Sequence, residues 1–209
     1  MFEKEMEYVV NFLHENKGND SRRKAETFRK RDTHMQRVLK WASKIVNELE
    51  ESEKLKIDTT SLYLACLFHD IGYGFETYKN SHPLQSGKIW KDYAKDKYDS
   101  NTIEYVYFLI TRHSNKELFE DNSTPIELVI LMEADWLDEE GAMSICWDLM
   151  VEGQNNPQSY EEALKRIKKY SAHILLDCPM VTNPAKCFWK HKQKVVKNFI
   201  DELESDLNR

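Results

Sequence analysis

Apolar residues recur every three to four positions along nearly the whole chain, which is the spacing of α-helices. From Thr33 onward they form one stripe of a long helix, made of Met35, Val38, Leu39, Ala42, Ile45, Val46 and Leu49. The next run, residues 62–68, is apolar on all sides and predicts a buried central helix that ends near Gly72 and Gly74. No segment alternates apolar and polar positions convincingly over more than four residues. The pattern predicts an all-α protein.

Further helices are expected at six places along the remaining sequence. They cover residues 84–97, a segment from Asp99 or Ser100 through 110, 125–137, a segment ending at Gly153, 159–176, and 183–203. There are no internal repeats, no low-complexity stretches and no linker long enough to divide the chain. We therefore expect one helical domain over residues 1–209, with seven to nine helices.

Charge and composition narrow the range of partners. The 209 residues include 30 Lys and Arg against 36 Asp and Glu, a net charge of −6. This balance argues against a nucleic-acid polymer as partner, because such binding needs a cationic surface. The negative net charge does not exclude a small anionic substrate, since a bound metal can make the local electrostatic potential positive. No apolar run approaches the roughly 18 residues of a membrane span, no signal peptide is visible, and the four cysteines lack CxxC spacing. The expectation is a cytoplasmic protein with no membrane partner.

Histidines and carboxylates on core-facing positions are the informative chemistry, because glycine-rich nucleotide loops and the GxSxG serine motif are absent. His34 lies at the edge of the first stripe, and His69-Asp70 ends the apolar helix. Adjacent helical residues diverge by about 100°, so this pair can converge on one point only at a helix end. His113 and Asp135 continue the apolar stripes of two later helices. Each residue alone has an ordinary structural interpretation, such as a hydrogen-bonded core histidine or a salt-bridged acid.

Together these side chains suit a divalent cation, which offsets the cost of burying the carboxylates. Nitrogen and oxygen donors without a thiolate favour Mn, Mg, Fe, Co or Ni over a structural zinc. We expect one or two ions in the helical core.

The same residues resemble the H…HD…D signature of the HD superfamily of metal-dependent phosphohydrolases. His34 is followed by ACLFHDIG (65–72) and then by Asp135. HPLQSG (82–87) resembles the HxxxSA element, ITRHS (110–114) the IxxHS element, EADWLD (133–138) the DADRLD element, and MVTNPAK (180–186) the closing MxTxxAK segment. The resemblance spans about residues 25–205. It is closest to small single-domain HD hydrolases, some of which split nucleoside triphosphates into monophosphate and pyrophosphate.

The resemblance implies roles for particular residues. One divalent cation would be ligated by His34, His69, Asp70 and Asp135. His82 and His113 match positions that hold a second metal in dinuclear members and lie near the substrate phosphates in mononuclear ones. Two positions depart from the family pattern, since Glu133 replaces an aspartate and Trp136 replaces an arginine. The second change removes a guanidinium that could pair with an acid or a phosphate.

The function predicted from the sequence is a metal-dependent phosphohydrolase for a nucleotide or related phosphate ester, with nucleoside triphosphate pyrophosphohydrolysis first. Alternatives are a phosphomonoesterase or phosphodiesterase, a di-iron HD-fold oxygenase, and a non-catalytic regulator that binds metal or nucleotide. Asp70 or Glu76 would act as base. His82 and His113 would stabilise charge on the phosphate. The expected substrate-binding residues are Arg37, Lys79, His82, His113 and Asp138. A homodimer joined through an apolar helical face is compatible with the sequence.

Overall fold

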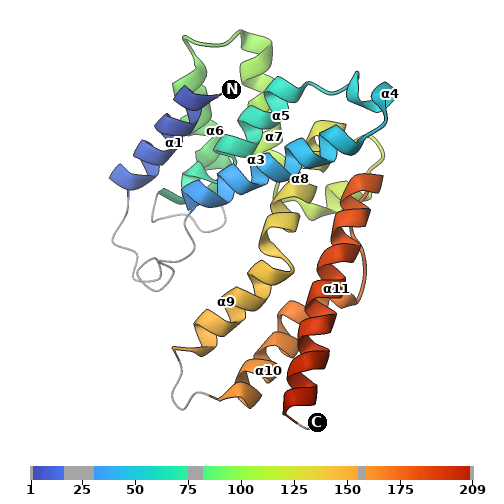
Figure 1. The fold of residues 1–209 in the computed structure, drawn as a ribbon. Coiled ribbons are helices and arrows are strands. Elements are labelled where there is room, and N and C mark those ends of the chain that lie inside the picture. Colours follow the sequence, from blue (N-terminus) through green and yellow to red (C-terminus); the bar gives the residue numbers. More distant parts are fainter. Residues whose placement is uncertain (1, 17–30, 75–81, 155–158, 208–209) are drawn as a thin grey trace. The chain divides into compact units, whose positions relative to one another are not determined.

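The computed structural model describes residues 2–16, 31–74, 82–154 and 159–207, and within these ranges all regular secondary structure is helical. The α-helices are α1 (Glu3–Glu15), α3 (Arg31–Glu48), α4 (Glu51–Lys54), α5 (Thr59–Phe68), α6 (His82–Ala94), α7 (Ser100–Arg112), α8 (Ile126–Glu139), α9 (Ala142–Glu152), α10 (Tyr160–Lys169) and α11 (Asn183–Asp206). Three 3₁₀-helices are η1 (Ile71–Gly74), η2 (Lys116–Phe119) and η3 (Ser171–Leu175). The all-α prediction is confirmed (Figure 1).

The chain forms two compact units, residues 1–134 and 135–209. The predicted helices are present with shifted ends, and two helices, α1 and the four-residue α4, are not among the sequence predictions. The first unit contains every segment that carries the candidate histidines from 34 to 113.

Helix α5 is the centre of the first unit. Asp58 caps its N-terminus by accepting a hydrogen bond from the backbone N–H of Ser61 at 3.0 Å. Its apolar side chains are almost all fully buried: Leu62, Leu64, Ala65, Cys66, Leu67 and Phe68. Helices α1, α3, α6 and α7 all contact it. Burial of each large apolar side chain contributes roughly 1.5–3 kcal/mol, so this packing fixes where the polar end of α5 lies.

Helices α6 and α7 pack closely against each other. A Cβ at Gly87 would lie 2.7 Å from the ring of Tyr107, so α6 can approach α7 this closely only without a side chain there. Trp90 is buried, stacks edge-on against Phe68 at 5.1 Å between ring centroids, and donates its indole N–H to the carbonyl of Ile103 at 3.0 Å. These contacts fix how α6 packs against α7 and α5.

In the second unit, α9, α10 and α11 pack side by side (Figure 1). The helix expected over 159–176 ends at Lys169 and continues as η3. The reason lies in Asp148, whose buried carboxylate accepts from the backbone N–H of Ser171 at 3.2 Å and from its hydroxyl at 2.6 Å. The amide of Ser171 therefore bonds to a side chain instead of continuing the α-helical ladder.

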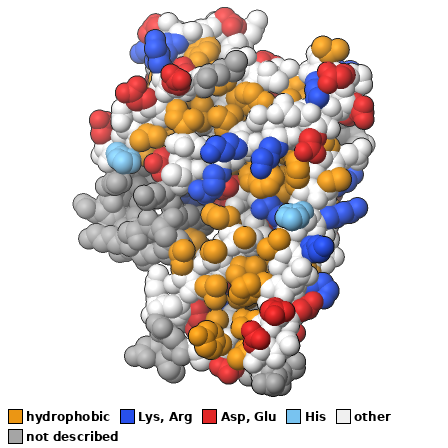
Figure 2. Space-filling view, viewed as in Figure 1, with side chains coloured by type: hydrophobic (Ala, Val, Ile, Leu, Met, Phe, Trp, Pro, Cys, Tyr) orange, Lys and Arg blue, Asp and Glu red, His pale blue; other side chains and the backbone are white. Residues whose placement is uncertain are grey.

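Helix α9 exposes apolar side chains. Met143, Leu149 and Met150 are 44, 38 and 48% exposed, and Figure 2 shows hydrophobic groups gathered over this part of the surface. Among the helices that the structure describes, none has the length and apolar character needed to span a bilayer.

Candidate metal centre

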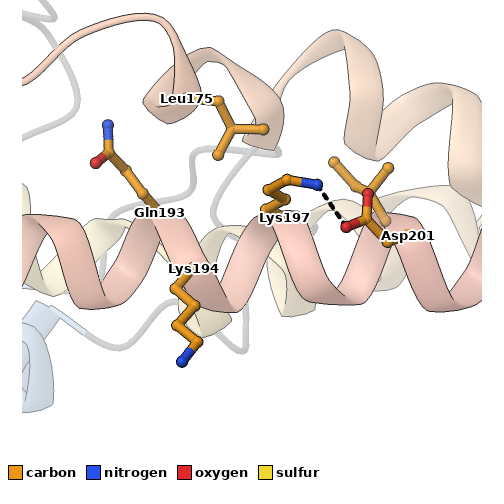
Figure 3. Close-up of a pocket in the computed structure, with 6 residues that line it drawn as sticks. Leu175, Gln193, Lys194, Lys197 and Asp201 are labelled. Carbon is orange, nitrogen blue, oxygen red and sulfur yellow. Dashed lines mark hydrogen bonds and ion pairs between the residues drawn. The ribbon is translucent and has the colours of Figure 1, made fainter.

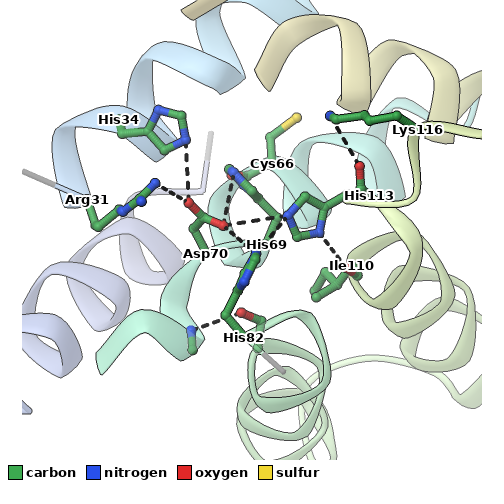
Figure 4. A network of polar contacts seen from close by, with 11 residues as sticks. Arg31, His34, Cys66, His69, Asp70, His82, Ile110, His113 and Lys116 are labelled. Atoms are coloured by element: carbon green, nitrogen blue, oxygen red, sulfur yellow. Dashed lines mark hydrogen bonds and ion pairs between the residues drawn. The ribbon is translucent and has the colours of Figure 1, made fainter. Parts of the chain in front are cut away.

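Four segments of the first unit bring their polar side chains to one point (Figure 4). His34 comes from the first turns of α3, His69 and Asp70 follow the last residue of α5, His82 opens α6, and His113 follows α7. The prediction that the His69-Asp70 pair stands at a helix end is confirmed, because α5 ends at Phe68. All five side chains are buried except that of His82, which is 13% exposed.

The carboxylate of Asp70 lies at the centre of this cluster. Its Oδ1 is 3.4 Å from Nε2 of His82, 3.6 Å from Nε2 of His113 and 3.7 Å from Nε2 of His69. Its Oδ2 is 3.6 Å from Nε2 of His34 and 2.6 Å from Nη1 of Arg31. Each oxygen of the carboxylate therefore faces a different set of nitrogen atoms.

Backbone carbonyls fix the orientation of two imidazoles. Nδ1 of His69 lies 2.9 Å from the carbonyl oxygen of Cys66, and Nδ1 of His113 lies 2.6 Å from that of Ile110. A carbonyl only accepts, so each Nδ1 carries the proton and donates. In the neutral rings the Nε2 lone pairs then point into the cluster, which is the orientation of a metal-ligating histidine supported by a backbone carbonyl.

The electrostatics keep Asp70 ionised and His82 neutral at pH 7. Burial alone would raise the pKa of Asp70, but favourable electrostatic interactions with the surrounding imidazoles, that of His69 first, and with the Arg31 guanidinium outweigh it and hold the pKa well below its usual range. Burial lowers the pKa of His82 to about 4, although the nearby Asp70 carboxylate opposes the shift. An ionised carboxylate and a neutral imidazole are the protonation states that ligate metals.

Gly72 allows η1 to lie directly against the start of α6. A Cβ at this position would collide with the backbone oxygen of His82 and the hydroxyl of Ser86. The backbone N–H of Gly72 instead donates to Ser86 Oγ at 2.9 Å. This close approach places His82 beside Asp70 although the two are twelve positions apart.

Two donor groups within the first unit could each hold a metal ion. One is His34, His69 and Asp70, and the other is Asp70, His82 and His113; within each group the donor atoms lie within 4.8 Å of one another. Asp70 belongs to both groups. The donors are imidazole nitrogens and carboxylate oxygens, so this set fits a divalent cation such as Mn, Fe or Co.

Five other residues were predicted for the site: Arg37, Glu76, Lys79, Asp135 and Asp138. Arg37 donates to Thr33 within α3 at 3.3 Å. Glu76 and Lys79 lie in the segment 75–81, which is not described. Asp135 and Asp138 stand on α8 in the second unit, half-buried and buried; their functional roles stay predictions.

The two departures from the family pattern are also located. Glu133 is fully buried on α8. Trp136 packs against Trp189 of α11, with 6.1 Å between ring centroids, so its ring contributes to the packing of the second unit.

Sequence reasoning missed Arg31, which reaches Asp70 directly. The one sequence feature that could have indicated a role for Arg31 is its position, one helical turn before His34 at the end of a basic run.

The second unit contains a cavity of about 520 Å³ between η3 and α11 (Figure 3). It is lined by Leu175, Gln193, Lys194, Lys197, Ile200 and Asp201. Its carboxylate, Asp201, is paired with Lys197 at 2.6 Å. The lining has no imidazole and a single acid, so it does not offer a metal site.

The model of the HD domain family matches residues 31–140, just over half of the chain. The chain therefore belongs to the HD domain family. No curated protein matches it by sequence.

Solved structures share the fold over almost the entire chain. The Lin1889 protein of Listeria innocua is 23% identical, covers 100% of this chain and 98% of its own, and has a TM-score of 0.61. An HD-superfamily hydrolase of Bacillus thuringiensis is 19% identical, with coverages of 99 and 96% and a TM-score of 0.68. Bacillus subtilis YpgQ in complex with ADP is 18% identical, with coverages of 99 and 97% and a TM-score of 0.62. At these identities the likeness shows a common fold.

Proposed function

We propose that this protein is a metal-dependent phosphohydrolase that acts on a nucleotide or a related phosphate ester. Hydrolysis of a nucleoside triphosphate to a monophosphate and pyrophosphate is the leading reaction. The observation that carries the proposal is the buried Asp70 carboxylate, faced by imidazole nitrogens from four positions. The ADP held by the similarly folded YpgQ supports a nucleotide as ligand.

In this proposal His34, His69 and Asp70 hold one divalent ion, with Asp135 as the fourth ligand. Asp70, His82 and His113 form the second donor group and would hold a second ion. Mn, Mg, Fe, Co and Ni are the candidate metals. A divalent ion bound there would polarise a phosphoryl oxygen and lower the pKa of water towards neutrality.

The low pKa of Asp70 favours a role as ligand and as acceptor that orients water, because a strongly depressed pKa makes a weak general base. Glu76 is then the preferred base of the two candidates. His82 is neutral at pH 7, which favours metal ligation over a cationic contact to phosphate. Arg37, Lys79 and Asp138 stay the proposed contacts to substrate.

The direct test loads metal-stripped protein with each candidate metal and supplies nucleoside tri-, di- and monophosphates and a phosphodiester. Products are separated by chromatography and pyrophosphate is quantified. We expect Mn-dependent release of pyrophosphate from a triphosphate. Asp70→Asn and His69→Gln should lose at least a hundredfold in kcat, whereas His191→Gln, which removes an exposed imidazole from α11, should keep wild-type activity. Full activity of Asp70→Asn would refute the proposal.

A di-iron oxygenase is the second candidate, because a carboxylate common to two donor groups would also suit two irons. Iron in the purified protein together with oxygen consumption would favour this reaction. Metal binding without turnover of any compound would instead favour a regulator.

We also propose that the two units act together as one HD-type protein. The predicted homodimer needs an apolar helical face, and α9 exposes one. Light scattering coupled to size-exclusion chromatography measures the oligomeric state: a mass near twice the 24.8 kDa of the chain supports the dimer, and a monomer mass contradicts it.

A further inference from the structure

Arg31 is held beside the Asp70 carboxylate by two contacts. Its Nη1 donates to Asp70 Oδ2 at 2.6 Å, and its Cζ lies 4.0 Å from the ring centroid of Tyr73. Tyr73 in turn stacks on His82 at 4.2 Å between centroids. The side chains of Arg31 and Asp70 are 20 and 5% exposed. Figure 4 shows Arg31 and His34 approaching the same oxygen of Asp70.

Oδ2 of Asp70 is therefore a possible partner both for the Arg31 guanidinium and for a metal ion. Oδ2 of Asp70 faces His34, and these two residues with His69 form one of the two donor groups. A divalent ion in that group would meet a guanidinium that is always charged. Like charges repel most strongly where water is excluded, and the carboxylate between them is almost fully buried.

We propose that Arg31 is an internal counter-ion that competes with the metal for Asp70 and thereby couples metal binding to the binding of an oxyanion. The proposal rests on the metal site of the proposed function. In the metal-free protein Arg31 neutralises a buried carboxylate. The positive charge of the guanidinium opposes metal binding. This opposition is relieved when an anion, in place of Asp70, accepts the hydrogen bonds of the guanidinium.

Phosphate oxygens are suitable acceptors, because a guanidinium matches their geometry with two parallel donors. The coupling is reciprocal by thermodynamic linkage: phosphate tightens metal binding, and metal tightens phosphate binding by the same factor. Arg31 thus makes the binding of the metal and the binding of the anionic substrate depend on each other.

The test is calorimetric titration of metal-stripped protein with Mn²⁺, which needs no turnover. Arg31→Gln removes the charge, and we expect it to bind Mn²⁺ at least tenfold more tightly than wild type. Lys40→Gln is the matched control, because it removes one positive charge from an exposed position of the same helix; its affinity should stay within twofold of wild type. Unchanged or weaker binding by Arg31→Gln would overturn the proposal.

A second arm adds inorganic phosphate to the same titrations. Phosphate should tighten Mn²⁺ binding several-fold in wild type and less than twofold in Arg31→Gln; an equal gain in both would overturn the coupling. Thermal unfolding covers the case in which Arg31→Gln is unstable without metal, since Mn²⁺ should then raise its Tm more than that of wild type. Failure of every variant to bind Mn²⁺ refutes the proposed function, whereas equal binding by wild type and Arg31→Gln refutes only the role of Arg31.

Discussion

Acid should destabilise the metal-free protein through His82, and the size of the effect follows from its pKa. The folded protein holds this proton with a pKa of about 4, against 6.5 for an unperturbed histidine. The folded state therefore binds the proton more weakly than the unfolded chain does. The stability contributed by neutral His82 is complete above pH 6.5 and is lost as pH falls from 6.5 towards 4.

At pH 5 His82 is protonated in most unfolded molecules but in few folded ones. By linkage, this difference lowers the free energy of unfolding by about 2 kcal/mol. With a typical slope of about 2 kcal/mol per molar urea, the midpoint falls by about 1 M from this residue alone. Other histidines also titrate, so the informative quantity is the difference between wild type and His82→Gln, which cannot take up the proton.

The assay is urea unfolding at pH 8 and pH 5 with a chelator present. Wild type should lose about 2 kcal/mol more than His82→Gln between the two pH values, and His191→Gln should behave as wild type. The same loss in wild type and His82→Gln would show that His82 is not held neutral by burial, and the reasoning about its protonation state would be wrong.

Three further perturbations test the scaffold of the site. Gly72→Ala places a methyl group against the backbone of His82 and should weaken Mn²⁺ binding by about tenfold in a titration; unchanged affinity would contradict the need for this close approach. Glu127→Leu leaves the backbone N–H of Asp58 and the hydroxyl of Tyr105 without their acceptor and should cost about 3 kcal/mol in urea unfolding. Burial and the Glu127 carboxylate raise the pKa of Tyr105 above the usual value of 10. The stability that this hydroxyl contributes is therefore complete below pH 10 and is lost as the pH rises further. Between pH 9 and pH 11, Tyr105→Phe should lose less free energy of unfolding than wild type does.

The sequence predicted the position of the central pair because two constraints coincide there. A charged carboxylate cannot follow a fully apolar helix without a partner, and Gly72 marks the end of that helix. The structure bears out both, since α5 ends at Phe68 and Asp70 is surrounded by nitrogen donors. The motif resemblance then assigned His82 and His113 to the same site. Helical periodicity alone could not show that these residues, far from Asp70 in the sequence, lie beside it in the fold.

What the sequence could not predict depends on contacts between distant segments. Arg31 belongs to a basic run that resembles a solvated surface, and only the fold shows that it reaches Asp70. The pattern over 159–176 is continuously helical, but Asp148 captures the amide and hydroxyl of Ser171 and ends the α-helix early. The apolar periodicity of one segment cannot show that a side chain from another helix will end it.

A divalent cation bound at Asp70 is central to the proposed function, and anomalous diffraction from crystals grown with Mn²⁺ tests for it most directly. We expect a manganese peak at about 2.0–2.3 Å from Nε2 of His34, Nε2 of His69 and a carboxylate oxygen of Asp70. An anomalous map with no peak among these three side chains, from protein crystallised with excess Mn²⁺, would contradict it.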